Sequence, residues 1–151
     1  MVHDEGRQFT ALDERRCREL LESTDLARVA WQTADGPQIL PVTYVCHGDS
    51  FVFRTSPSGP LSELIRPTDV ALEIDELDRR RRSGWSVVVQ GRATAVAEPA
   101  EMVHLWTVAG LMPWAPGVRN VFIQVAPRRI SGRWLGHEPG LQEPTRRGGP
   151  R

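Results

Sequence analysis

Short stretches of alternating apolar and polar residues, separated by tight turns, dominate the chain between residues 26 and 135. The pair Asp35-Gly36 lies between two such stretches, which is a strong signal for a β-hairpin. A second turn at His47–Ser50 leads into a third stretch. Because alternation predicts half-buried strands, residues 26–55 predict a three-stranded meander. The chain must therefore build its core mainly from a sheet.

Further strands are expected at residues 69–77, 85–97, 120–127 and 129–135. Proline cannot donate to a ladder, so Pro41 predicts an edge position or a bulge in its strand. Gly91 similarly predicts a bulge or a sharp bend. Closing a sheet of six or seven short strands removes its exposed edges, so we expect a small antiparallel barrel, with an open α+β sandwich as the alternative.

Two helices and one shorter helical segment interrupt the strands. Residues 12–23 have the apolar spacing of a helix, and Thr10 followed by Asp13-Glu14 resembles a capping box. Residues 60–66 can form about two helical turns with Pro60 at the first position, where proline is tolerated. A second helix is expected to begin near Pro99. The fold class is therefore predicted as mainly β, a barrel with flanking helices.

Length and composition limit the domain organisation. A chain of 151 residues, 40% hydrophobic and 25% charged, can bury one ordinary core. We expect a single domain over residues 1–135 and a disordered tail over residues 136–151, where apolar residues are scarce. No apolar run reaches the roughly 20 residues that span a bilayer, and the first residues lack a secretory h-region. These features predict a cytoplasmic protein without a membrane partner.

The chain has no lysine, since all 19 basic residues are arginine. This excludes a Schiff base, a lysine general base and a P-loop lysine. A phosphate would have to be held by arginine, hydroxyls or backbone N–H groups. The stretch SFVFRTSPSGPLSEL, residues 50–64, offers these groups at a strand end, and Arg54 is its candidate anion contact. The alternative for Arg54 is an ion pair with Glu73 or Asp75.

Several other features have structural interpretations as well as functional ones. Glu73 and Asp75 share a strand face and could act in acid–base chemistry, although an arginine-satisfied surface is the more common arrangement. The run Arg79–Arg82 follows acidic residues, and the formal net charge is zero, so we expect a solvated loop and no nucleic-acid partner. Trp85 could belong to the core or to a cleft.

Cysteine and histidine spacing supports neither a disulfide nor a metal site. Cys17 and Cys46 are expected to be reduced core thiols. The four histidines form no HxxxH or HExxH arrangement, so no metal is expected. His104 could serve as a haem ligand, but a surface or core histidine is the more ordinary interpretation. No hydrolase motif is present.

The order of these segments resembles a known family. LARVAW, DGPQILPVTY, DSFVFRTSPSG, VALEIDELD, SGWSVVVQGRA and ISGRWL, spread over residues 12–135, are similar to the pyridoxamine 5′-phosphate oxidase-like proteins, which include nitroimidazole-resistance-type reductases. The resemblance implies a six-stranded antiparallel split barrel of the FMN-binding type that forms a homodimer. It also implies a flavin, FMN in most members and a deazaflavin in some, in a groove between the subunits.

The resemblance also implies site residues. The flavin ring would lie along Pro41 and Val42, and the phosphate or ribityl chain would face Arg54, Thr55 and Ser56, with Ser58 and Gly59 in the turn beneath and Trp85 and Ser86 lining the cleft. Relatives often carry lysine where this chain has Pro60.

The implied activity is hydride transfer from flavin or deazaflavin to a small electrophile such as a nitroaromatic or a quinone, with no catalytic residue assigned. The alternative is a non-catalytic barrel that binds flavin or haem, or that has lost its ligand.

Overall fold

The computed structural model describes residues 9–108, 111 and 117–136, which form one seven-stranded antiparallel sheet with two α-helices and a 3₁₀ helix. In chain order the elements are β1 (Phe9–Leu12), α1 (Glu14–Glu22), β2 (Leu26–Thr33), β3 (Gly36–His47), β4 (Ser50–Thr55), the 3₁₀ helix η1 (Pro60–Ile65), β5 (Thr68–Asp78), β6 (Ser83–Ala95), α2 (Pro99–Thr107) and β7 (Val121–Leu135). The predicted mainly-β class is confirmed. Of the tail expected over residues 136–151, all but Gly136 lies outside the described residues.

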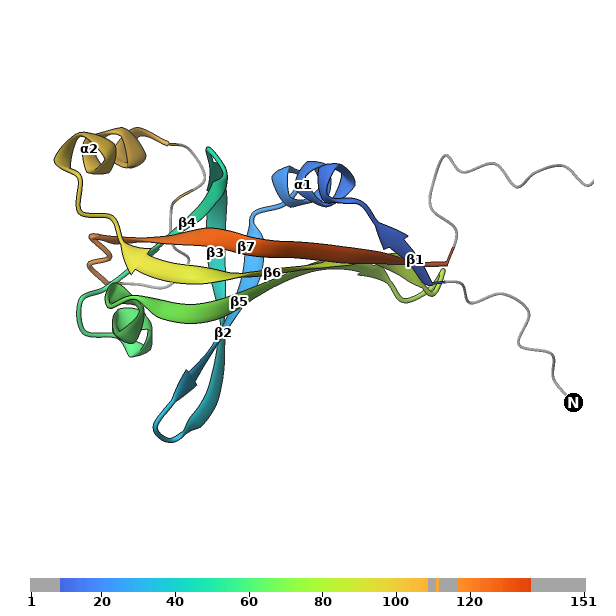
Figure 1. Ribbon diagram of the computed structural model, residues 1–151, viewed down its shortest axis with the longest axis horizontal. Coiled ribbons are helices and arrows are strands. Elements are labelled where there is room, and N and C mark those ends of the chain that lie inside the picture. The colour runs from blue at the N-terminus through green and yellow to red at the C-terminus, as the bar shows by residue number, and fades with distance from the viewer. Residues whose placement is uncertain (1–8, 109–110, 112–116, 137–151) are drawn as a thin grey trace, which may run out of the picture.

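Six of the seven strands close into a barrel. β7 pairs with β4, the ladder continues through β3, β2 and β5 to β6, and β6 pairs again with β7. β1 lies outside this ring, because it pairs only with the end of β7 at Gly132–Leu135. The barrel thus has the predicted six strands, β1 is a seventh strand of the sheet, and the open sandwich is wrong because the ring is closed. Figure 1 shows β6 and β7 running side by side toward β1.

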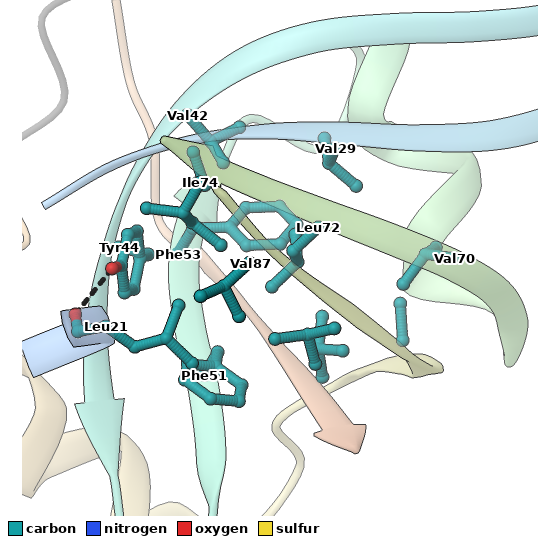
Figure 2. Packing of buried hydrophobic residues seen from close by; sticks show 14 of the residues in the cluster. Leu21, Val29, Val42, Tyr44, Phe51, Phe53, Val70, Leu72, Ile74 and Val87 are labelled. Carbon is teal, nitrogen blue, oxygen red and sulfur yellow. Dashed lines mark hydrogen bonds between the residues drawn. The ribbon is translucent and has the colours of Figure 1, made fainter. Parts of the chain in front are cut away.

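Alternate positions of the strands fill the barrel. Val29 on β2 is opposite Leu72 on β5, which is opposite Val89 on β6, and all three side chains are fully buried. Burial of apolar surface of this kind is the main source of stability in a small domain. The buried Tyr44 hydroxyl donates to the carbonyl oxygen of Leu21, which ties the end of α1 to β3 within this core (Figure 2).

The two α-helices cover different parts of the barrel. α1 begins one residue after Asp13, whose carboxylate accepts from the Arg16 backbone N–H at 2.8 Å, so Asp13 is the N-cap and the capping box predicted from Thr10 is wrong. Thr10 belongs to β1, a strand that was not predicted. α2 contributes Leu105 to a second, smaller cluster that contains Val52 and Phe122.

Gly91 marks the predicted bulge. Gln90 is opposite Arg129 and Gly91 is opposite Pro127, so the register of β6 and β7 shifts by one residue at this point. An added Cβ at Gly91 would lie 2.3 Å from the Ala126 carbonyl oxygen, which explains why glycine is needed here. The two strands expected at residues 120–127 and 129–135 are therefore one strand, because proline at a bulge does not end the ladder.

Pro41 occupies the expected edge position. Residues Gly36–Thr43 of β3 pair with β2 alone, and β3 pairs with β4 only from Tyr44 onward. One side of Pro41 therefore faces no strand, which suits a residue without an N–H donor. η1 begins with Pro60, as predicted, but it is a 3₁₀ helix of six residues and not an α-helix. No helix in the described part of the chain has the length and hydropathy to cross a membrane.

Candidate functional site

The corner between β4 and η1 is the first candidate site. Thr55 ends the strand and is fully buried, and its hydroxyl lies 3.4 Å from the Ser56 carbonyl oxygen. Ser58 is exposed, and a Cβ added to Gly59 would lie 2.8 Å from Ser56 Oγ, so the Ser56 hydroxyl lies against the open side of this glycine. The corner therefore carries two serine hydroxyls just before the start of η1. The buried Thr55 contacts the Ser56 backbone from the core side.

Arg54 lies on the other face of β4. Its side chain alternates with the buried Phe53 and Thr55 and extends toward α2, where its guanidinium carbon is 4.2 Å from the centre of the Trp106 ring. Arg54 Nε donates to the Arg119 carbonyl oxygen at 2.8 Å, and Nη1 donates to the Leu111 carbonyl oxygen at 3.4 Å. Partial burial lowers the pKa of Arg54. The described contacts of this arginine thus hold α2 and the segment before β7 against the barrel.

The remaining predicted site residues divide between the two faces of the sheet. Val42 and Trp85 are buried in the core, at 8% and 4% exposure, so Trp85 packs as a core residue and its side chain does not line an open cleft. Pro41 is opposite Arg28 on β2, and Ser86 is opposite Asp75 on β5. Side chains directly opposite each other share a face. Pro41 and Ser86 therefore lie on the outer face of the sheet, around the Arg28 ion pair described next.

Arg28 is the arginine that pairs with both Glu73 and Asp75. Arg28 Nη1 lies 3.0 Å from Glu73 Oε2 and 3.6 Å from Asp75 Oδ1. Burial, and next the negative charge of Asp75, raise the pKa of Glu73. The suggested pairing of Arg54 with these carboxylates is wrong, because β5 is adjacent to β2 and β6 and not to β4. Arg28 could have been found from the sequence only if the strand order had been known.

A phosphate-bearing cofactor places clear requirements on the Ser56–Gly59 corner. Pro60 supplies neither a charge nor an N–H donor there. An open hollow of about 660 Å³ adjoins the corner at Pro57 and is also lined by Ser62 and by the exposed Arg66. Glu63 lines it too, with its carboxylate accepting from Trp31 Nε1. Hydroxyls and a nearby guanidinium are groups that bind phosphate, so the residues present fit an anionic group. Arg66 was not predicted as a site residue, because the sequence does not show that it and Pro57 line one hollow.

Other titratable groups give weaker candidates. His47 Nε2 lies 3.1 Å from Glu101 Oε1, and its ring centre is 5.5 Å from that of the exposed His104. Within the described residues no group of three or more ligating side chains could hold a metal ion. Cys17 and Cys46 are both unpaired thiols, and burial raises the pKa of Cys46 to about 11, so this thiol is protonated at neutral pH.

The fold defines a split-barrel protein. It consists of a closed six-stranded barrel with one additional strand and two flanking α-helices, and a polar corner follows β4, the third strand of the meander. Comparison with known proteins agrees with this class. The family model described as pyridoxamine 5′-phosphate oxidase matches residues 13–134, and the chain belongs to this family.

Three relatives illustrate the range of the family. An uncharacterized protein of Mycobacterium tuberculosis is 33% identical over 84% of this chain and 86% of its own length. A Corynebacterium glutamicum structure, named provisionally as a pyridoxamine 5′-phosphate oxidase, is 28% identical with a TM-score of 0.74 over 86% of this chain and all of its own. The FAD binding protein of Mycobacterium smegmatis is 26% identical with a TM-score of 0.70, over 85% of this chain and 98% of its own.

Proposed function

We propose that this protein is a flavin-dependent oxidoreductase that passes hydride to a small electrophile such as a nitroaromatic or a quinone. Membership of the family over residues 13–134 is the observation that carries the proposal. The similarity to an FAD-binding protein supports a flavin as the cofactor. FMN is the flavin that the sequence resemblance implies, and a deazaflavin is the alternative. A bound flavin supplies the hydride chemistry, and the chain supplies binding and orientation.

The proposed roles of the residues follow from their positions. Ser56 and Ser58 donate hydroxyl hydrogen bonds to the phosphate or ribityl chain, and the backbone at Gly59 allows close approach. Arg66 supplies the positive charge that Pro60 lacks. Thr55 is buried and positions the serines.

On the outer face of the sheet, Pro41 and Ser86 contact the ring. Val42 and Trp85 hold their strands from the core, with backbone contacts at Val42. This division of roles would place the ring over the face that also bears the Arg28 ion pair.

We also propose that the protein forms a homodimer with the flavin between subunits. Two features support a partner on the outer face of the β2–β3 hairpin. Among the described strands only β2 pairs with residues Gly36–Thr43, and Ile39 is 60% exposed there. Light scattering coupled to size-exclusion chromatography tests this proposal, which predicts twice the mass of the chain. The expectation of a cytoplasmic protein remains a prediction.

A non-catalytic flavin- or haem-binding protein is the second candidate, and Pro60 is the observation that favours it. A corner without a strong cation could hold a cofactor without providing the environment for turnover. The two candidates differ in one measurable property, which is whether the loaded protein passes electrons onward.

The rate at which an acceptor reoxidises the reduced protein separates these candidates. The purified protein is loaded with each flavin in turn, reduced with a nicotinamide donor or chemically, and mixed with a nitroaromatic or a quinone. The oxidoreductase predicts reoxidation of the flavin that is faster in the presence of the acceptor than with buffer alone. Reduced protein that does not respond to any acceptor would favour the binding protein. Protein that gains no absorbance with flavin, deazaflavin or haem would contradict both.

A further inference from the structure

The bulge between β6 and β7 places two consecutive arginines around one hollow. Consecutive side chains of a regular strand point to opposite faces. Here Gln90 is opposite Arg129 and Gly91 is opposite Pro127, so Arg128 is the additional residue of the bulge. Both Arg128 and Arg129 line the same open hollow of about 400 Å³. In a regular strand Arg128 and Arg129 would point to opposite faces. Because of the bulge, Arg128 lines the hollow as a second cation beside Arg129.

An aspartate holds part of this arginine cluster in place. Asp69 Oδ1 lies 3.2 Å from Arg128 Nη1 and 3.3 Å from Arg92 Nη1. Asp69 Oδ1 therefore accepts from two guanidinium groups, and within the described part of the chain no other side-chain bond of Arg92 or Arg128 is present. No residue in the described ranges forms an ion pair or a hydrogen bond with the Arg129 side chain. Two arginines, Arg128 and Arg129, line the hollow against the one carboxylate of Asp69, which Arg92 also contacts, so positive charge is in excess there.

The β2 and β5 lining of the hollow, which we call its floor, carries two small apolar side chains. Ala30 on β2 and Ala71 on β5 are opposite each other in register and both line the hollow, whose lining also includes the polar Gln90. Larger side chains at these two positions would fill the space. The hollow therefore brings small side chains together with two arginines, and guanidinium groups are the side chains best suited to bind planar or tetrahedral oxyanions.

We propose that this hollow binds the anionic end of a small molecule, a phosphate or a carboxylate group, through Arg128 and Arg129. Arg128 is held by Asp69 in the orientation that binding needs, and Arg129 is the cation whose donors are not engaged within the described structure. The hollow shares no residue with the Ser56–Gly59 corner. The inference therefore goes beyond the proposed flavin chemistry and does not depend on it.

Calorimetric titration of the full-length protein with inorganic phosphate and, separately, with succinate tests the proposal. We expect saturable binding of at least one probe at one site per chain, and the stronger probe identifies the anion chemistry. Replacing both arginines, in Arg128→Ala/Arg129→Ala, should weaken binding roughly tenfold or more, because charge-assisted hydrogen bonds are lost. The matched control is Arg80→Ala/Arg81→Ala, which removes the same charge from the exposed hairpin between β5 and β6 and should change affinity less than about twofold.

A second variant separates the hollow from a general effect of charge. Ala71→Leu fills the floor without changing any charge, and it should also weaken binding, with folding checked by circular dichroism. Unchanged affinity in Ala71→Leu or in the double arginine variant would overturn the proposal. The absence of binding by both probes would also overturn it. Binding that survives in the double arginine variant but is lost in Ser56→Ala would place the anion at the corner and not in this hollow.

Discussion

Arg28 on β2 and Glu73 on β5 face each other across the sheet, with Arg28 Nη1 3.0 Å from Glu73 Oε2. Despite this contact the pKa of Glu73 is raised, because burial and the neighbouring charge of Asp75 outweigh the arginine. Between the ordinary glutamate pKa of about 4.3 and the raised value, the folded chain binds more protons than the unfolded chain. This carboxyl therefore makes the free energy of unfolding fall as pH rises through that window.

Glu73→Gln should remove this pH dependence. We expect the parent to lose stability relative to Glu73→Gln as pH rises from about 4 toward 7, because the amide cannot ionise. Urea unfolding at a series of pH values measures the difference. Glu76→Gln, an exposed carboxyl on the same strand, serves as the control and should follow the parent. Parallel stability curves for the parent and Glu73→Gln would contradict the prediction.

Trp31→Phe should loosen η1. Trp31 is 5% exposed, and its Nε1 donates to Glu63 Oε2 at 2.9 Å, which ties the 3₁₀ helix to β2. Loss of this hydrogen bond should lower the free energy of unfolding by about 1–3 kcal/mol. Chemical denaturation measures the change. Glu63→Gln keeps an oxygen acceptor and should cost less, so an equal or larger loss in Glu63→Gln would contradict the assignment.

Gly91→Ala should destabilise the barrel at its bulge. The added Cβ would meet the Ala126 carbonyl oxygen at 2.3 Å, and a backbone atom of a paired strand cannot move aside cheaply. We expect a loss of about 1–3 kcal/mol or more. Gly59→Ala is the matched control, since its Cβ would meet only the Ser56 hydroxyl, which can rotate. Thermal unfolding that ranks the two variants in the opposite order would refute this account of the bulge.

Arg54→Ala should release α2. The arginine contacts the Trp106 ring and donates to two backbone carbonyls, while the apolar cluster beneath α2 is small. We expect faster amide hydrogen exchange in residues 99–107, with less change in β2 and β5. Exchange that rises equally in all elements would instead assign Arg54 a global role. If the same variant binds flavin as tightly as the parent, Arg54 is not a cofactor contact.

The sequence predicted those parts of the fold that depend on local signals. Gly91 and Pro41 mark a bulge and an edge because glycine lacks a side chain and proline lacks an N–H donor, and both properties can be read from the sequence. β1 was missed because a four-residue strand at Phe9–Leu12 forms only through pairing with β7, more than 100 residues away. Pro127 was misread as the end of a strand, since the bulge that accommodates it is set by Gly91 on another strand.

The candidate site was predictable to a similar extent. The Ser56–Gly59 corner could be predicted because the end of β4 and the turn after it are both marked by neighbouring residues in the sequence. The partner of Glu73 and Asp75 depends on strand order, which alternation does not encode, and so Arg28 was missed. The grouping of Arg128 with Arg129 depends on a register shift between β6 and β7. The hollow that these arginines line could therefore not have been predicted from residue spacing alone.

Titration with FMN, FAD and a deazaflavin, followed by quenching of flavin fluorescence, tests the central claim most directly. The account predicts that one flavin binds per chain and that Ser56→Ala/Ser58→Ala weakens its binding roughly tenfold or more. Thr24→Ala, which removes a hydroxyl from the connection between α1 and β2, should bind as the parent does. Failure of all three cofactors to bind the parent, or equal affinity in the double serine variant, would contradict the assignment of this corner as the flavin site.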